Sequence, residues 1–181
     1  LPVSSIRARA AARYAGRLRC EELYALDPSS FPDLPDDGLA HLEPLLCTPS
    51  LLHRPPWDLA LFTGRNAGEA QLAIERLGLD VLPSRRKVDD GVRARKPSPD
   101  GLVELAAEGL GLVFVGDSID DQRAAVAYRE RLPEGPRLTF VRVLGPEATS
   151  QQVTQARADG ADIVVAGLDD FIRLVREARQ A

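Results

Sequence analysis

From residue 57 onward, short apolar runs alternate with longer stretches in which apolar residues recur at helical spacing. The apolar runs have the length of buried strands and cover residues 58–63, 112–115, 138–143 and 163–165. The stretches with helical spacing cover residues 67–77, 99–108, 120–131, 150–159 and 168–179. Strands that alternate with helices in this way predict an α/β fold, in which helices cover both faces of a parallel sheet.

The N-terminal third of the chain has a different pattern and predicts a small, mostly helical unit. Apolar residues recur at helical spacing over 3–25, and a second helical stretch over 39–53 is interrupted by proline. Pro55 and Pro56 then mark a boundary. The chain is therefore expected to divide into two units, residues 1–56 and residues 57–181.

The composition is that of an ordinary globular protein, since 44% of the 181 residues are hydrophobic and 28% are charged. The formal net charge of −4 disfavours broad nucleic-acid binding, which needs a cationic surface. The longest apolar runs, such as residues 110–116, are too short to cross a bilayer, so no membrane partner is expected. Cys20 and Cys47 are too few for a disulfide framework, and as thiols of a reducing compartment they predict a cytoplasmic protein.

Polar residues with chemical potential follow the predicted strands, where ligands of open parallel sheets bind. Thr63, Gly64 and Arg65 end the first apolar run and precede a helix. A hydroxyl together with free backbone N–H groups at a helix N-terminus can bind a phosphate oxygen. The alternative is a turn that only caps the helix.

A second signal is Lys96, which lies in the polar and basic segment 84–100 and is followed by Pro-Ser-Pro. Proline at 97 favours an extended Lys96, and the next helix begins just after it. An ammonium group fixed at the sheet edge would neutralise a phosphate or an acyl phosphate. The nearby arginines are expected to be solvated or to steer anions.

The third signal is a group of carboxylates at Asp117, Asp120 and Asp121, directly after the run at 112–115. Carboxylates that crowd together repel one another unless a cation lies among them. Mg²⁺ suits such a site, because it takes one or two carboxylates together with waters and phosphate oxygens. The alternative is that Asp120 and Asp121 only stabilise the N-terminus of the following helix.

In this order on successive strand–helix units, the three signals supply the groups that phosphoryl transfer requires around a nucleophile. Here the chain resembles the haloacid dehalogenase-like (HAD) superfamily, over about residues 57–175. Phe-Thr63-Gly-Arg is similar to the second motif of the family, Lys96-Pro-Ser-Pro to the third, and Gly-Asp117-Ser-Ile-Asp-Asp to the fourth. The resemblance implies a Rossmannoid three-layer core with a small α-helical cap, as in subfamily I members of the histidinol-phosphatase and phosphoglycolate phosphatase types.

The resemblance also implies roles for the phosphate-binding residues. Thr63 would bind the transferred phosphoryl group, while Gly64 and Arg65 would shape the phosphate loop. Lys96 would pair with both the nucleophile and the phosphate, as a catalytic residue. Nothing in these motifs separates a hydrolase from a phosphomutase.

For the metal, the resemblance assigns Asp117 as the Mg²⁺ ligand and catalytic carboxylate, with Asp121 or Asp120 as a second acidic partner. The first motif of the family, Asp-x-Asp after the first strand, does not occur after any strand predicted in residues 1–56. Residues 1–7 are similar to the segment that follows this motif, so the nucleophile is expected upstream of residue 1.

These expectations combine into a Mg²⁺-dependent phosphomonoester hydrolase that acts on a small phosphorylated metabolite through an aspartyl-phosphate. The alternative is a non-catalytic HAD-like regulatory or interaction domain that has lost the nucleophile motif. A receiver-like or nucleotide-binding domain is a third reading. It is disfavoured because the chain has neither Gly-x-Gly-x-x-Gly after a strand nor a Gly-x-x-x-x-Gly-Lys-Ser/Thr loop.

Overall fold

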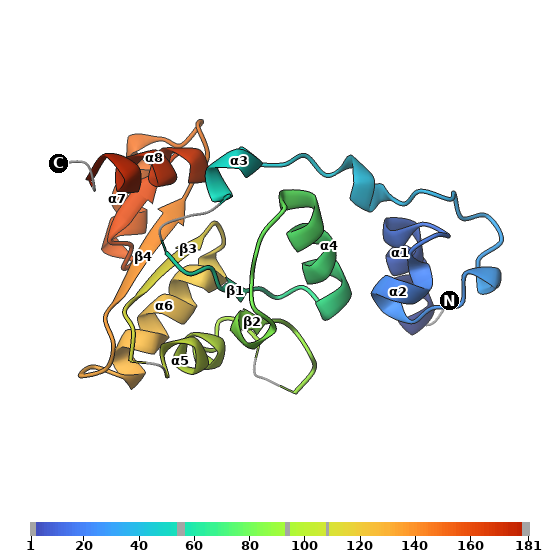
Figure 1. Ribbon diagram of the computed structural model, residues 1–181, viewed down its shortest axis with the longest axis horizontal. Helices are drawn as coiled ribbons and strands as arrows, with labels where there is room; N and C mark the ends of the chain where they lie inside the picture. The colour runs from blue at the N-terminus through green and yellow to red at the C-terminus, as the bar shows by residue number, and fades with distance from the viewer. Residues whose placement is uncertain (1–2, 54–56, 93–94, 108, 179–181) are drawn as a thin grey trace.

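The computed structural model describes residues 3–53, 57–92, 95–107 and 109–178, and shows a mixed α/β fold with parallel strands (Figure 1). One sheet consists of β1 (Leu61–Phe62) and β2 (Arg86–Lys87). The other has the order β3 (Leu112–Gly116), β4 (Leu138–Val143), β5 (Ile163–Val165). All three strand pairings are parallel, so the carboxyl ends of paired strands lie at the same edge.

Helices cover both faces of the three-stranded sheet. They are α5 (Asp100–Ala106), α6 (Ile119–Arg131), α7 (Ser150–Ala158) and α8 (Leu168–Ala178). A further helix, α4 (Ala67–Leu77), lies between this sheet and the N-terminal helices (Figure 1). Side chains alternate along the strands, so Phe114 and Phe140 pack toward α5, α6 and α7, whereas Val141 and Val165 pack toward α8. The predicted α/β class, with a parallel sheet between helices, is confirmed.

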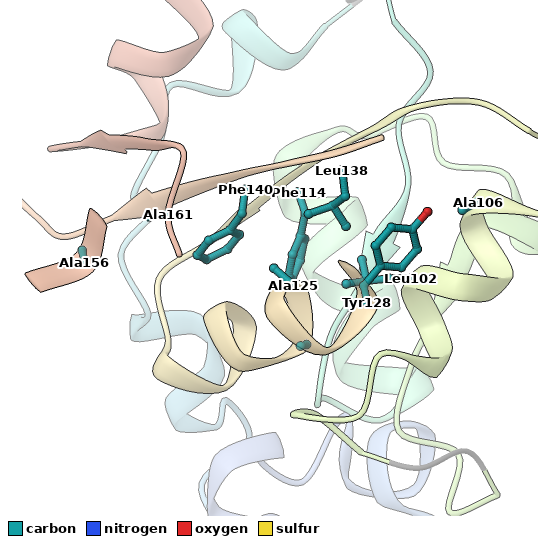
Figure 2. Close-up of a cluster of buried hydrophobic side chains, with 10 residues drawn as sticks. Leu102, Ala106, Phe114, Ala125, Tyr128, Leu138, Phe140, Ala156 and Ala161 are labelled. Carbon is teal, nitrogen blue, oxygen red and sulfur yellow. The ribbon is translucent and has the colours of Figure 1, made fainter. Parts of the chain in front are cut away.

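The largest cluster of buried side chains lies between this sheet and α5 and α6. Figure 2 shows Phe114 and Phe140 directed from their strands toward Ala125 and Tyr128 of α6. The two phenylalanine rings have centroids 5.5 Å apart. The hydroxyl of Tyr128 donates to the carbonyl of Pro136 at 2.8 Å, which satisfies the only polar group of this side chain. Each such buried side chain contributes roughly 1.5–3 kcal/mol, which fixes α6 and the loop before it against the sheet.

Element bounds agree with the sequence pattern wherever local signals are strong. α4 begins after Asn66, whose side chain accepts a hydrogen bond from the amide of Glu69 at 2.9 Å. It ends at Gly78, which has a φ of +61°. β4 and β5 have the predicted bounds. Caps and apolar periodicity are both local properties, so they can be read directly from the sequence.

The single helix predicted over residues 3–25 is wrong. α1 (Val3–Ala15) ends at Gly16, which has a φ of +73°, and α2 (Cys20–Tyr24) follows after a turn. At this turn the chain approaches the backbone of Gly38 so closely that a Cβ on Gly16 would lie 2.2 Å from the Gly38 amide nitrogen. The helix is interrupted because this contact, made by a distant loop, fixes the glycine in a left-handed conformation.

The second predicted helical stretch, 39–53, forms only short pieces. These pieces are η2 (Leu39–Leu42) and α3 (Pro49–Leu52), and a 3₁₀ turn, η1 (Pro28–Ser30), precedes them. The amide and hydroxyl of Thr48 donate to the carboxylate of Asp169 in α8 at 2.8 and 2.6 Å. Arg176 of α8 donates to the carbonyl of Leu51 at 2.9 Å. α3 is therefore bound to the α/β part of the chain, although it lies within the predicted N-terminal unit.

α1 and α2 pack around a hydrophobic cluster of their own, which α4 joins through Leu72. The other buried members are Ala12, Ala15, Cys20, Leu23, Leu34 and Ala40. Figure 1 shows these two helices at one end of the molecule, with α4 between them and the three-stranded sheet. Nowhere in the described ranges is a helix both long and apolar enough to cross a membrane.

The strands differ from the prediction in two respects. β2 lies in the polar segment 84–100, where the pattern predicts no strand, and β1 includes only two of the residues predicted over 58–63. Within the described residues, β1 and β3 are not hydrogen-bonded to each other, so the expected single sheet is divided. The rings of Phe62 and Phe114 nevertheless lie 5.8 Å apart, which places the two sheets next to each other.

Candidate functional site

Lys96 lies at the centre of the strand-end residues that the sequence singled out. Its Nζ donates to the carbonyl of Phe62, the last residue of β1, at 3.3 Å and to Asp121 Oδ1 at 2.5 Å. The ammonium also lies 5.1 Å from the centroid of the Phe62 ring. Its side chain is 17% exposed and that of Asp121 is 5% exposed, so this is a largely buried ion pair. The structure therefore connects the predicted second, third and fourth motif positions through one side chain.

Asp121 is held from three directions. Besides Lys96, the amide of Ser118 donates to Oδ2 at 2.9 Å and the Ser118 hydroxyl donates to it at 2.6 Å. Ser118 Oγ in turn accepts from the amide of Asp121, which completes a capping box at the start of α6. Burial by itself raises the pKa of the Asp121 carboxyl, but the hydrogen bonds from Lys96 and Ser118 outweigh burial and lower it. Asp121 is thus an anion that stabilises both Lys96 and the helix.

Gly116 makes room for this carboxylate at the end of β3. A Cβ on Gly116 would lie 2.5 Å from Asp121 Cβ and 2.8 Å from Oδ2. Replacing Gly116 with Ala is therefore expected to displace α6 or Asp121 and to lower the free energy of unfolding by about 1–3 kcal/mol. Urea unfolding monitored by circular dichroism measures this change. An unchanged unfolding midpoint would contradict the close packing of Asp121 against β3.

Thr63, Gly64 and Lys96 line one small hollow at the carboxyl end of β1 and β2. The other lining residues are Phe62, Lys87, Val88, Asp89 and Arg95. Its volume of ≈ 10 Å³ admits about one water molecule, so a phosphate group requires side chains to move. Lys87 and Arg95 make ion pairs, with Glu104 at 2.9 Å and Asp89 at 2.8 Å. The sequence did not single out Lys87, because β2 lacks an apolar pattern that would have placed it at a strand end.

Arg65 lies away from this hollow. Its amide donates to Thr63 Oγ1 at 3.2 Å, which supports the turn, but its guanidinium contacts the N-terminal helical part. Nη1 donates to the hydroxyl of Tyr14 at 2.8 Å, and Nη2 forms an ion pair with Glu43 at 3.2 Å. A separate cavity of ≈ 120 Å³ between α4 and the N-terminal segment is also lined by Tyr14, Glu43 and Arg65. In the structure, Arg65 acts as a link between the two parts of the chain.

The three carboxylates of the predicted metal site have different surroundings. Asp121 faces β3 and Lys96, Asp120 pairs with Arg123 at 3.5 Å, and Asp117 is exposed to solvent. The described residues contain no group of three or more His, Cys, Asp or Glu side chains placed to hold a metal ion. Asp121 is engaged with Lys96 and Ser118, which leaves Asp117 and the half-exposed Asp120, so a metal here would need further ligands from the substrate, from water or from another segment.

Comparisons with known proteins give the fold only. No protein-family model and no curated protein matches the chain. An X-ray structure of a Northeast Structural Genomics Consortium target is similar, with a TM-score of 0.69 and 16% sequence identity. The match covers 98% of this chain and 54% of the other, so this chain spans about half the length of that protein. At this level of identity, the similarity shows a shared α/β arrangement.

Proposed function

We propose that this chain is part of a Mg²⁺-dependent HAD-like phosphatase, which hydrolyses a small phosphorylated metabolite through an aspartyl-phosphate. The observation that carries the proposal is the position of Lys96. Its ammonium joins the end of β1, next to Thr63, to the first turn of α6, just after Asp117. A cation held between two strand ends, beside a hydroxyl and an open carboxylate, suits the binding and transfer of a phosphoryl group.

In this proposal the residues of the hollow bind the phosphate. The hydroxyl of Thr63 and the amide of Gly64 donate to phosphate oxygens, since the amides of Thr63 and Arg65 donate to Lys87 and to Thr63 Oγ1. Lys96 neutralises the charge that develops on the phosphoryl group, and Asp121 fixes the direction of its ammonium. The small size of the hollow implies that Lys96 or Arg95 shifts when phosphate enters.

The edge of β1 that faces away from β2 supports the proposed position of the nucleophile. Backbone groups of successive residues in a parallel strand point alternately to the two sides. The Thr63 amide donates to Lys87 of β2 at 2.9 Å, so the backbone of Phe62 faces the opposite side. There its carbonyl accepts from Lys96 instead of from a strand. This edge is therefore open to a further strand.

β3 has a matching edge. The Leu112 amide donates to Arg137, just before β4, at 2.8 Å, so the backbones of Val113 and Val115 face away from β4. Unpaired N–H and C=O groups along a strand edge are a template for a further strand, and a parallel strand between β1 and β3 would pair with both edges. We place the nucleophilic aspartate at the carboxyl end of this strand, upstream of residue 1.

Magnesium fits this arrangement in part. Asp117 directly follows β3 and is exposed, so it offers one carboxylate oxygen. An Mg²⁺ ion held by Asp117, the nucleophilic carboxylate and phosphate oxygens would neutralise charge on the transferred group. In this proposal Asp120 stabilises the N-terminus of α6, and Asp121 pairs with Lys96. Asp120 is at most a metal ligand through water.

The N-terminal helical part takes the role of a small cap that closes over the site. Its contacts with Arg65, two residues from Thr63, are consistent with this position. Such caps exclude water and select substrates by size, which favours a small metabolite.

The test uses the full-length protein that contains this chain, with a panel of small phosphate esters and p-nitrophenyl phosphate. We expect hydrolysis that requires Mg²⁺. Replacing Asp117 with Asn should lower kcat/KM by at least about 100-fold, because it removes a charged ligand of the transition state. Replacing Asp120 with Asn is the matched control and should change kcat/KM by less than about threefold.

The outcomes separate the two candidate functions. Equal losses in both variants, or hydrolysis independent of Mg²⁺, would contradict the role of Asp117. An intact mass of 19.6 kDa, or upstream residues without Asp-x-Asp, together with phosphate binding but no turnover, would instead favour the non-catalytic HAD-like domain.

A further inference from the structure

Arg142 on β4 has buried nitrogen atoms without partners. Its Nε and Nη1 are excluded from solvent, and neither makes a hydrogen bond in the described part of the chain. No other buried side-chain nitrogen or oxygen of the described residues is left in this state. Most buried polar groups in proteins are hydrogen-bonded, and a buried N–H donor without a partner is costly. Arg142 therefore needs an explanation that the rest of the fold does not supply.

The position of Arg142 follows from the strand register. It pairs with Gly116 of β3 on one side and with Val164 of β5 on the other. Residues paired in register share a face of the sheet, so Arg142 lies on the face that Phe114 and Phe140 present to α6. Gly116 is the residue against which Asp121 packs. Arg142 thus lies one strand away from the Lys96–Asp121 ion pair, at the carboxyl edge of the sheet.

The electrostatic surroundings increase the cost of this position. The first turn of α6 lies against the neighbouring Gly116, and the positive end of its helix dipole disfavours a cation. Asp121, which packs against Gly116, already accepts hydrogen bonds from Lys96 and Ser118. The best partner for the Arg142 guanidinium at this position is an oxyanion. An oxyanion accepts hydrogen bonds and offsets the positive charge of the guanidinium and that of the helix N-terminus.

We propose that Arg142 forms, with the first turn of α6, an oxyanion-binding site for a carboxylate or phosphate group of a small-molecule ligand. The site lies beside the hollow at Thr63 and Lys96 but is built from different residues. It does not depend on the proposed phosphatase activity, since only the orphaned nitrogens and the strand register carry it. If the chain is a phosphatase, the site selects substrates that carry a second anionic group.

The test compares Arg142→Met with Arg129→Met. Methionine keeps the apolar length of the side chain and removes the charge. Arg129 is the matched control, because its guanidinium is satisfied by the carbonyls of Gly160 and Leu138 at 2.8 and 3.3 Å and by Asp162. Thermal unfolding is measured in chloride, phosphate and acetate at constant ionic strength, and the affinities for phosphate and acetate are measured by isothermal titration calorimetry.

In chloride, the Arg142→Met protein should unfold at a higher temperature than the wild type, and the Arg129→Met protein at a lower one. Phosphate or acetate should raise the unfolding temperature of the wild type but not of Arg142→Met, with roughly tenfold or greater loss of affinity. Whichever anion shows the larger loss identifies the ligand group.

Three results would overturn the proposal. The first is destabilisation of Arg142→Met in chloride, which would mean that the guanidinium already has partners. The second is an equal affinity for the anions in Arg142→Met and in the wild type. This includes the result that Lys96→Met lowers the affinity whereas Arg142→Met does not. The third is a wild type that binds neither anion. Because these measurements need no turnover, they stand apart from the phosphatase assay.

Discussion

Replacing Asp121 with Asn is expected to lower the free energy of unfolding by about 3–5 kcal/mol, the range found when one partner of a buried ion pair is removed. Asp121 is 3% exposed and accepts from Lys96 and from both the amide and the hydroxyl of Ser118. An asparagine leaves the Lys96 ammonium without its counter-ion and weakens the cap of α6. Urea unfolding at neutral pH measures the effect.

Asp120 provides the matched control for this variant. It lies next to Asp121 in the same helix turn, but its pair with Arg123 is long, at 3.5 Å, and exposed. Asp120→Asn should therefore change the free energy of unfolding by less than about 0.5 kcal/mol. Equal losses in the two variants would show that net charge at the helix N-terminus, rather than the buried pair, determines stability.

The pH dependence of the same variant follows from the direction of the pKa shift. Burial opposes ionisation of Asp121, but the hydrogen bonds from Lys96 and Ser118 lower its pKa below the ordinary value. A lowered pKa in the folded state gives stability that is present above the unfolded pKa, about 3.9, and is lost as the pH falls through the folded pKa. The stability gap between wild type and Asp121→Asn should thus narrow below about pH 4. A gap that stays constant under acid would assign the stabilisation to another group.

Replacing Gly38 with Ala is expected to have the second large effect, about 3 kcal/mol of lost stability. A Cβ on Gly38 would lie 2.2 Å from Ala15 C, Gly16 N and Tyr14 O, all backbone atoms that cannot rotate away. The loop and the end of α1 must then separate, which disturbs the hydrophobic cluster of α1 and α2. Hydrogen exchange should increase in these two helices before it increases in β3–β5.

Gly111→Ala is the control for Gly38→Ala. A Cβ there would lie 3.4 Å from the Arg137 carbonyl, close to ordinary contact, so little change in stability is expected. If Gly38→Ala unfolds at the same urea concentration as Gly111→Ala, the contact between α1 and the Gly38 loop does not contribute to stability as described.

The sequence alone predicts the elements whose signals are local. α4 has its apolar spacing, an Asn66 cap and a glycine at its end, and β4 is a mainly apolar run between turns. The class of fold followed from the alternation of these elements. The neighbourhood of Thr63 and Lys96 was also predictable, because the carboxyl ends of parallel strands meet at one edge.

The partners of individual side chains were not predictable. The sequence grouped Asp121 with Asp117 and Asp120, yet the structure pairs Asp121 with Lys96, 25 residues earlier in the chain. Arg65 was expected to shape a phosphate loop, and nothing in the sequence indicated that its guanidinium contacts Tyr14 and Glu43. Both outcomes depend on which distant segments the fold brings together. Such contacts leave no mark in the local pattern of apolar and polar residues, so the sequence does not show them.

Periodicity and capping residues thus determined the strands, the helices and the edge at which polar residues gather. Tertiary structure alone decided the break at Gly16, the division between β1 and β3, and the orphaned nitrogens of Arg142. The physical reason is that periodicity reports how each segment divides between apolar and polar faces. Charge pairing and close backbone contact depend instead on distances between segments, which exist only once the chain has folded.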